Sequence, residues 1–251
     1  MTAHQVLLHN DGPALWPAHK PLEEVLELKA TTPELTWSGT YQGVPTPPGG
    51  YIFKRGWFSK NRYDIQDQKI KNLVYARYIS WDTANKAQEE NDYSAYTVAE
   101  LWPDYRLGIR HIEQMKVEFP DLTAAMESQA RIWNYDGKLH GVIIEDKASG
   151  TSALQTLAAS APAWLRPLLI PFIPTTDKIT RGSQVAVWCK NGSVLLPIPS
   201  EHCPWAIDFE DELFTFPQVA HDHRTDTFSQ IILYLEHILS AGYLARGGNQ
   251  Q

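Results

Sequence analysis

Residues 72–82 read NLVYARYISWD, and this stretch decides how the rest of the chain is arranged. It is rich in β-branched and aromatic side chains, which is typical of a strand, and it ends on Asp82. Two more runs of the same kind follow, YSAYTVAELW at 93–102 and YRLGIRHI at 105–112, with Pro103-Asp104 as the turn between them. Three consecutive strands with short connections predict an antiparallel meander.

The rest of the chain alternates between expected helices and strands. Apolar residues at helical spacing predict a helix over 119–134, and an apolar run predicts a strand over 139–145 (LHGVIIE). The further expected elements are a short helix at 152–160, a strand at 168–173, a helix at 177–190, an extended piece at 193–197, a helix at 208–215 and a long helix at 222–242. This order predicts an α/β fold with a mixed sheet covered on both faces.

The N-terminal part of the chain has a different character. Prolines and glycines cluster at 43–50 (GVPTPPGG), and aromatic residues follow at 51–63. A helix is predicted at 21–30, where Pro21 precedes two glutamates. We therefore expect residues 1–65 to form a linker or arm and residues 66–251 to form the main domain.

Composition excludes several classes of protein. Of the 251 residues, 43% are hydrophobic and 20% are charged, which excludes a largely disordered chain. The net charge of −7 argues against general attraction to nucleic acid or anionic membranes, although a local carboxylate cluster can bind cations that face phosphate. The two cysteines fit a reducing compartment. The most apolar stretch, 161–174, is short and interrupted by prolines, and no signal-peptide pattern is present, so we predict no membrane span.

Acidic residues stand at the ends of three expected elements. Asp82 ends the first strand, and Glu145 ends the fourth, so the two lie side by side if these strands are neighbours. Asp226 lies in the first turns of the last helix, and His223 three residues earlier shares its face. Crowded carboxylates repel one another unless a cation compensates them. Mg²⁺ and Mn²⁺ take oxygen ligands and tolerate an imidazole, and two such ions about 3.5–4 Å apart form the known clamp for phosphodiester hydrolysis.

Each of these positions also has an ordinary structural interpretation. An aspartate at a strand end is commonly a turn former or a helix cap, and Asp222 can cap the last helix. Glu145, Asp146 and Lys147 can form a solvent-exposed turn after the strand.

A zinc hydrolase is a further alternative. His221-x-His223 followed by Asp226 partly matches a zinc-binding pattern, but Thr227 stands where the next histidine should be. The cysteines and a nearby histidine lack the paired spacing of a zinc site; they are Cys189, His202 and Cys203.

Four short motifs, taken in order, are more informative than any single position. They are Asp82-Thr83-Ala84, Asn91-Asp92-Tyr93-Ser94-Ala95, Ile144-Glu145-Asp146-Lys147-Ala148-Ser149-Gly150 and His221-Asp222-His223-Arg224-Thr225-Asp226. They resemble the successive motifs of the nuclease domain of phage terminase large subunits, the DNA-packaging motors of tailed phages and prophages. Residues 36–58 are similar to the segment that joins the family's ATPase domain to its nuclease domain, so the resemblance covers nearly the whole chain.

The resemblance implies a fold and an activity. The family's nuclease domain is ribonuclease-H-like, which implies a mixed five-stranded sheet, three antiparallel strands and then two parallel ones, with helices on both faces. The implied activity is endonucleolytic cleavage of double-stranded phage DNA concatemers during genome packaging. It implies a two-metal-ion mechanism with Mg²⁺ or Mn²⁺.

The resemblance also implies roles for individual residues. Carried over by position, the catalytic metal ligands are Asp82, Glu145 and Asp226, and His223 takes a position that is Asp or His in this fold. Asp146 stays open as an alternative to Glu145, because adjacent side chains alternate across a strand. The implied auxiliary acids are Asp92 and Asp222, and Lys147 is a candidate phosphate contact. Basic residues near a later helix are further candidates for phosphate contacts; they include Lys178, Arg181 and Lys190. The simpler interpretation is that these side chains only cover solvent-exposed faces.

The sequence departs from the family in two ways. The usual Asp-Asp pair of the last motif is Asp222-His223, which implies a shift of preference towards Mn²⁺. No stretch matches G-x-x-x-x-G-K-[ST], so we expect the ATPase to belong to another polypeptide or to residues outside this sequence. The implied partners are double-stranded DNA, the terminase ATPase domain, the small terminase subunit and the portal, in the cytoplasm of a bacterial host cell and without a membrane.

Two other functions remain open at this point. A non-catalytic packaging module that docks on a portal, a motor or DNA would have acids that do not converge. Another ribonuclease-H-like nuclease, such as a junction resolvase, would share the fold but would have no use for the connector at 36–58.

Overall fold

The computed structural model describes residues 12–32, 37–42, 50–83, 93–119, 121–147, 149–219 and 221–247. By its internal contacts the chain divides into two compact units, Met1–Tyr51 and Ile52–Gln251. Residues 52–65, which we expected in the arm, have their contacts within the larger unit. The functional division into a connector and a nuclease domain stays a prediction.

The smaller unit is built around one helix, α1 (Leu22–Thr31), which confirms the helix expected at 21–30. Its Val25 is buried against Ala14 and Trp37. The Trp37 ring also stacks on Tyr41, with 5.3 Å between the ring centroids. This unit therefore has a small apolar core of its own.

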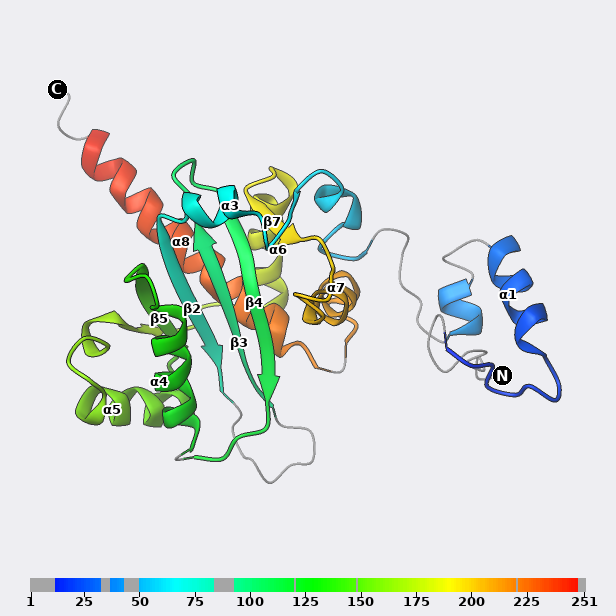
Figure 1. The fold of residues 1–251 in the computed structure, drawn as a ribbon, viewed down its shortest axis with the longest axis horizontal. Coiled ribbons are helices and arrows are strands. Elements are labelled where there is room, and N and C mark those ends of the chain that lie inside the picture. The colour runs from blue at the N-terminus through cyan, green and yellow to red at the C-terminus, as the bar shows by residue number, and fades with distance from the viewer. Residues whose placement is uncertain are drawn as a thin grey trace. The chain divides into compact units, whose positions relative to one another are not determined.

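Seven strands of the larger unit form one mixed sheet, in the order β1-β7-β4-β3-β2-β5-β6. The strands are β1 (Arg62–Tyr63), β2 (Ala76–Asp82), β3 (Ser94–Leu101), β4 (Leu107–Met115), β5 (Leu139–Glu145), β6 (Leu169–Phe172) and β7 (Val194–Pro197). Figure 1 shows β2, β3 and β4 side by side, and β3 is antiparallel to both neighbours. In contrast, β5 is parallel to β2, and β6 is parallel to β5. The carboxyl ends of β2 and β5 consequently lie at the same edge of the sheet.

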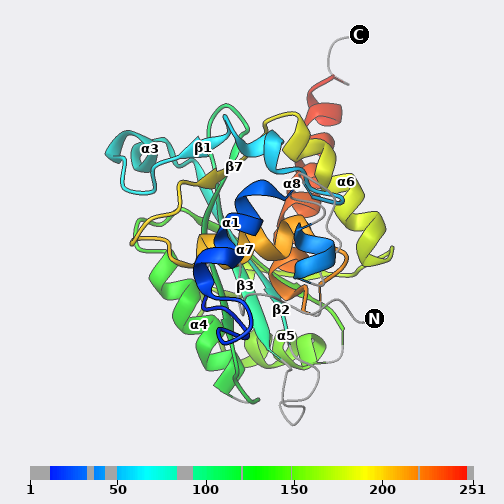
Figure 2. The ribbon, with the colours of Figure 1, turned by 90° about the vertical axis from the view of Figure 1, so that its right-hand side faces the viewer.

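Helices cover both faces of this sheet. They are α3 (Gln68–Leu73), α4 (Asp121–Trp133), α5 (Ser149–Ser160), α6 (Lys178–Lys190), α7 (Trp205–Thr215) and α8 (His223–Gly247), with short 3₁₀ turns at η2 (Arg55–Phe58) and η3 (Arg166–Leu168). Buried residues of α4 and α5 belong to the core on one face, whereas those of α6, α7 and α8 belong to the core on the other. Figure 2 shows α4 and α6 on opposite sides of the sheet. Within the described residues, no helix has both the length and the apolar character that crossing a membrane requires.

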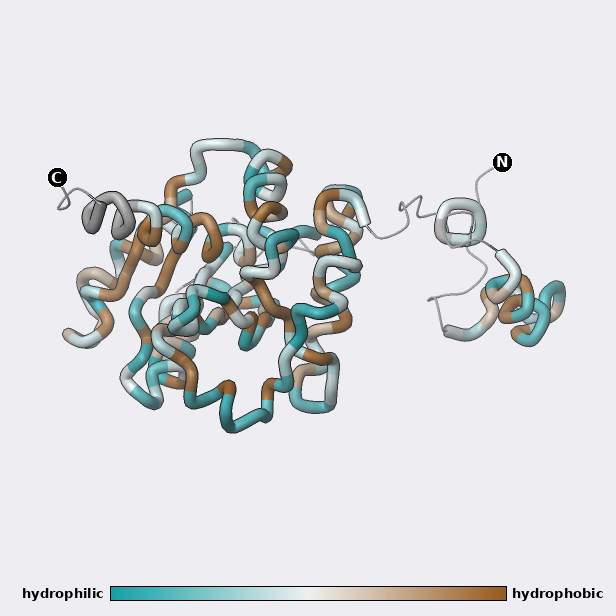
Figure 3. Tube along the Cα trace, turned by 90° about the horizontal axis from the view of Figure 1, so that it is seen from above, coloured by the Kyte–Doolittle hydropathy of each residue, from teal (hydrophilic) through white to brown (hydrophobic). Residues whose placement is uncertain are grey.

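Side chains of the central strands alternate between two apolar cores. In β2, Ile79 and Trp81 join the core under α4 and α5, whereas Tyr78 joins the core under α8. In β5, Ile144 and Ile143 divide in the same way. Figure 3 shows hydrophobic and hydrophilic stretches following one another along the larger unit, as expected where most elements bury one face. Strands that are covered on both faces read as nearly continuous apolar runs, which is the pattern in the sequence.

The predicted α/β fold with a ribonuclease-H-like sheet is confirmed, with two corrections of detail. The first long strand begins at Ala76 rather than at residue 72, because residues 68–73 form α3, where Asp67 accepts a hydrogen bond from the Lys69 backbone N–H at 2.8 Å. The extended piece expected at 193–197 is β7, which pairs parallel with β4 and also with β1. Among the described residues the sheet therefore has seven strands, and five consecutive ones, β4-β3-β2-β5-β6, are the predicted three antiparallel strands followed by two parallel ones.

Candidate active site

Asp82 and Glu145 end two neighbouring parallel strands. Trp81 of β2 pairs with Ile144 of β5, so the residues that follow them come side by side at the sheet edge. Asp82 lies four residues after Tyr78 in β2, and Glu145 lies two residues after Ile143 in β5. Residues an even number of positions apart in a strand point to the same face. Because successive side chains of a strand point to opposite faces, both carboxylates lie on the α8 face.

The connection from β5 into α5 is tight and ties the two strand ends together. A Cβ on Gly150 would lie 1.9 Å from the Glu145 carbonyl oxygen, so only glycine fits this close approach. The Ser149 hydroxyl lies 2.8 Å from the Thr83 hydroxyl, directly after Asp82. These contacts hold the ends of β2 and β5 against the start of α5.

The structure separates Glu145 from Asp146. Glu145 lines a pocket of about 130 Å³ at the sheet edge. Asp146 instead accepts a hydrogen bond at 2.6 Å from the hydroxyl of Thr151, in the first turn of α5. Of the two acids that the sequence left open, the structure brings Glu145 to the pocket.

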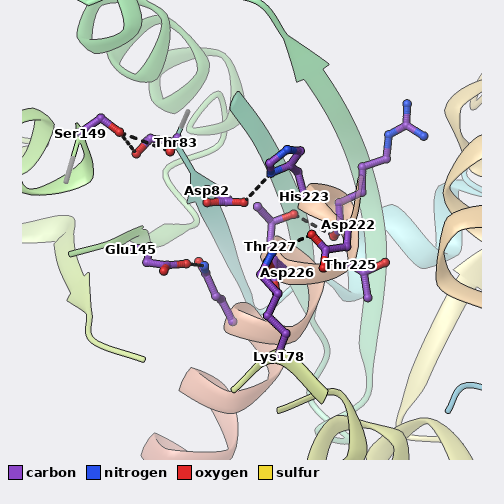
Figure 4. Close-up of polar contacts among 12 residues, drawn as sticks. Asp82, Thr83, Glu145, Ser149, Lys178, Asp222, His223, Thr225, Asp226 and Thr227 are labelled. Carbon is purple, nitrogen blue, oxygen red and sulfur yellow. Dashed lines mark hydrogen bonds and ion pairs between the residues drawn. The ribbon is translucent and has the colours of Figure 1, made fainter. Parts of the chain in front are cut away.

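One face of α8 supplies two residues of the pocket lining, His223 and Asp226, and a third residue that bonds to Glu145. His223 Nδ1 lies 3.0 Å from Asp82 Oδ2 (Figure 4). Gln230 donates from Nε2 to Glu145 Oε2 at 2.6 Å, and its own oxygen accepts from the Ser80 hydroxyl at 3.0 Å. Positions 223, 226 and 230 follow one helix face, so Asp226 lies between these two contacts along the helix.

The start of α8 is anchored from two sides. Glu212 of α7 accepts hydrogen bonds from the Thr225 backbone N–H at 2.8 Å and from its hydroxyl at 2.9 Å. The buried hydroxyl of Thr227 lies 2.7 Å from that of Thr97 on β3. These bonds fix the turn of α8 that carries His223 and Asp226.

Two cationic side chains of α6 approach the same turn of α8. Lys178 Nζ lies 2.6 Å from Asp226 Oδ2 and 2.6 Å from Asp222 Oδ1. Arg181 Nη2 lies 3.1 Å from Asp226 Oδ1. Asp177 starts α6 by accepting from the Thr180 backbone N–H at 2.9 Å, so the cap places Lys178 in the first turn.

All four residues that the resemblance assigned as ligands border one pocket. Its lining consists of Asp82, Thr83, Glu145, Lys147, Lys178, His223 and Asp226. The expected auxiliary acid Asp222 contacts this lining through Lys178. The other one, Asp92, lies outside the described residues.

Burial and crowding change the protonation of the pocket. Burial and the neighbouring Asp82 raise the pKa of Glu145. Burial also raises the pKa of Asp226, although the Lys178 ammonium opposes this effect. The hydrogen bond to Asp82 raises the pKa of His223. The site therefore contains more negative charge than its buried position favours.

The residues present fit a divalent cation at one end of the pocket. Across the part of the chain that the structure describes, no three His, Cys, Asp or Glu side chains converge closely enough to hold a metal ion as placed. Asp82 and Glu145 supply two carboxylates. Burial and then repulsion by Asp82 raise the pKa of Glu145, and a cation would relieve that repulsion. Mg²⁺ characteristically uses one or two carboxylates and keeps several waters.

The histidine and cysteines that we considered as zinc ligands have other contacts in the structure. His223 turns to Asp82, and Cys203 donates from its thiol to the Ile198 carbonyl oxygen at 3.2 Å. Cys189 is also buried, and burial raises the pKa of its thiol. These residues form no shared site among those that the structure describes.

Sequence reasoning missed two parts of the site. It did not identify Gln230 and Ser80, and it placed Lys178 and Arg181 only as general phosphate contacts. The spacing of Gln230 from His223 and Asp226 was a usable signal, because all three share one helix face. No local sequence pattern indicates a role for Lys178, because its partners Asp222 and Asp226 lie at least 44 residues away in the sequence.

Comparison with known proteins identifies the fold. No protein-family model and no curated protein matches the sequence. The structure is similar to the large terminase of a thermophilic bacteriophage in complex with ADP, with a TM-score of 0.52 and 10% identity over 87% of this chain and 52% of that chain. The chain shares its fold with part of a large terminase.

Two nuclease structures are also similar. The human cytomegalovirus terminase nuclease domain matches with a TM-score of 0.49 and 12% identity, over 72% of this chain and 92% of that chain. The large terminase nuclease of the thermophilic phage G20c with bound zinc matches with a TM-score of 0.45 and 20% identity, over 62% of this chain and 78% of that chain. The chain spans about half the length of the ADP-bound large terminase, and the likeness concerns the fold.

Proposed function

We propose that this chain is the nuclease part of a phage terminase large subunit, a divalent-metal-dependent endonuclease that cleaves double-stranded DNA concatemers during genome packaging. One observation carries the proposal: Asp82, Glu145, His223 and Asp226, from three separate elements, line a single pocket. A docking module without catalysis would leave these acids apart. Their convergence at the carboxyl edge of a sheet with this fold favours catalysis.

Asp82 and Glu145 are the proposed centre of the cation site, with His223 and Asp226 beside them. When bound, the cation would polarise the scissile phosphodiester and make a water more acidic. The carboxylates themselves fix the position of that charge at the strand ends. Gln230 and Ser80 restrict Glu145, because the amide of Gln230 bridges the two side chains.

His223 is the proposed proton-handling group of the pocket. When Nδ1–H donates to Asp82, Nε2 keeps its lone pair and can accept a proton from a water molecule. The same hydrogen bond raises the pKa of His223, which improves the ring as a base. Asp82 thus orients the ring in addition to binding a cation.

DNA contact is proposed to be local, because the chain has a net charge of −7. Lys147 and Lys178 line the pocket and can attract phosphate there. The terminase ATPase domain, the small subunit and the portal are the proposed partners, in the cytoplasm of the bacterial host. These partners follow from the family resemblance.

Plasmid cleavage tests the proposal. Purified protein is expected to nick or linearise supercoiled plasmid with Mn²⁺ or Mg²⁺ and to be inactive in EDTA. Asp82→Asn and Glu145→Gln are expected to abolish cleavage while the thermal unfolding midpoint stays close to that of the wild type. A four-way junction tested as a second substrate separates this function from that of a resolvase, which would prefer the junction.

Asp146→Asn is the matched control. Asp146 adjoins Glu145 in sequence but bonds Thr151, and an asparagine oxygen can keep that bond. This variant is expected to cleave like the wild type. Normal cleavage by Asp82→Asn, or loss of cleavage in Asp146→Asn alone, would contradict the assignment.

A further inference from the structure

Lys178 places a positive charge between two carboxylates of the pocket. Its ammonium lies 2.6 Å from Asp222 Oδ1 and 2.6 Å from Asp226 Oδ2. Figure 4 draws these three side chains at the start of α8. An ammonium group has three N–H donors, and these two contacts use two of them. Lys178 also lines the pocket, so its third donor is available to an anionic oxygen there.

Asp226 is already compensated by protein cations. Its two oxygens face different partners, Lys178 on Oδ2 and Arg181 on Oδ1. Asp226 is 3% exposed and Arg181 is 5% exposed, so this pair is held away from water. Burial of a carboxylate is costly without such partners, and here two cationic side chains supply them.

The opposite wall of the pocket lacks this compensation. The partners of Asp82 and Glu145 among the described residues are His223 and Gln230, one titratable ring and one neutral amide. No lysine or arginine in the described part of the chain forms an ion pair with either carboxylate. Arg181 and Lys147 offset part of the negative charge of Glu145 from a distance, but no cation in the described residues bonds to the carboxylates at the ends of β2 and β5.

We infer that this site takes one divalent cation, at Asp82 and Glu145, and that the ammonium of Lys178 supplies the second positive charge next to Asp226. The inference rests on the proposed function, and it revises the expectation of two ions. In a two-ion site, the second ion stabilises charge on the phosphodiester. Here the third N–H of Lys178 would donate to a phosphodiester oxygen, held in place by its bonds to Asp222 and Asp226. Lys178 is then a catalytic residue, whereas Arg181 positions Asp226.

The alternative is that Lys178 closes an ion site in the metal-free protein and moves away when a second ion binds. The two possibilities differ in how many ions the wild type binds. They also differ in the effect of removing the ammonium. A catalytic ammonium is required for cleavage, whereas a displaceable one is not.

Mn²⁺ binding followed by electron paramagnetic resonance tests this directly on the full chain, without DNA. The wild type is expected to bind one Mn²⁺ per chain. Lys178→Met removes the charge but keeps a similar stem, and this variant is expected to bind a second Mn²⁺ beside Asp222 and Asp226. Lys147→Met is the matched control, because Lys147 lines the same pocket without a described bond to these acids, and it is expected to bind one ion.

Plasmid cleavage provides the second measurement. Lys178→Met is expected to lose about 100-fold in kcat at low Mn²⁺, the size of effect typical of removing one donor to a developing negative charge. It is expected to regain activity at Mn²⁺ concentrations that fill its second site, whereas the wild type saturates with a Hill coefficient near one.

Two Mn²⁺ ions per wild-type chain, or full activity of Lys178→Met at low Mn²⁺, would overturn the inference and leave the nuclease proposal intact. A wild type that binds no Mn²⁺ and cuts no DNA would instead refute the proposed function.

Discussion

Glu212 caps the helix that carries two of the pocket residues, and its charge opposes folding. It accepts two hydrogen bonds from Thr225, and only 8% of its side chain is exposed. Burial raises the pKa of this carboxyl from 4.5 to about 7. We predict that Glu212→Gln stabilises the protein at alkaline pH, because the amide oxygen still accepts both bonds and no charge is buried.

The pKa of Glu212 sets the size and the pH range of this effect. Because its pKa is higher in the folded protein, the folded state holds the proton more tightly than the unfolded chain. Its contribution to stability is complete below about pH 4.5 and is lost as the pH rises through about 7. The difference between the two pKa values corresponds to about 3 kcal/mol. This figure already includes the attraction of Arg224, whose guanidinium lies 3.9 Å from the carboxylate, so we expect Glu212→Gln to gain about 3 kcal/mol at alkaline pH.

Urea unfolding of both proteins across the range from acidic to mildly alkaline pH measures this effect. The free energy of unfolding should agree near pH 4 and diverge in favour of Glu212→Gln near pH 8. Glu201→Gln is the control, because the Glu201 side chain is 88% exposed, and its difference from the wild type should not change with pH. A difference between wild type and Glu212→Gln that stays constant over this range would refute the reasoning.

Three further substitutions test contacts near the site and in the core. Gln230→Leu removes the donor to Glu145, so cleavage should fall about tenfold, and undiminished kcat would contradict a positioning role. The variant also leaves the buried Ser80 hydroxyl without its acceptor, so the free energy of unfolding should fall by about 1–3 kcal/mol. Gly182→Ala puts a Cβ 2.8 Å from a ring carbon of Phe216, and denaturant unfolding should show a loss of about 1–3 kcal/mol. Arg77→Met leaves two carboxylate partners without their buried cation, and it should lower the free energy of unfolding by about 3–5 kcal/mol; an unchanged urea midpoint would argue against this ion network.

The sequence predicted the middle of the sheet well, because its strands are long and are covered on both faces. Because the strands are covered on both faces, however, the sequence did not show which acid enters the pocket. Residues 142–144 are all apolar, so the sequence does not show which face of the sheet Glu145 points to and which face Asp146 points to. Only the structure shows which face each residue points to, because Ile143 lies in the core on the α8 side and Ile144 lies in the core on the other side.

Contacts between distant segments were the part that the sequence could not supply. Lys178 and Arg181 meet Asp222 and Asp226 across 44 and 45 residues, through the packing of α6 on α8. In the sequence, each is an ordinary basic residue of a helix. Their partners are fixed by how two helices cross the same sheet face, and single-helix periodicity does not contain that information.

The last helix explains how so few residues build the pocket. His223, Asp226 and Gln230 follow one face of α8, and from it they reach the end of β2, the cations of α6 and the end of β5. Successive helix residues are rotated by about 100°, so inserting one alanine after Thr225 would turn Gln230 away from Glu145 while His223 kept its place. The acids at the strand ends would remain, but Glu145 would lose its positioning bond. The pocket thus depends on the register of α8 as much as on the identity of its acids.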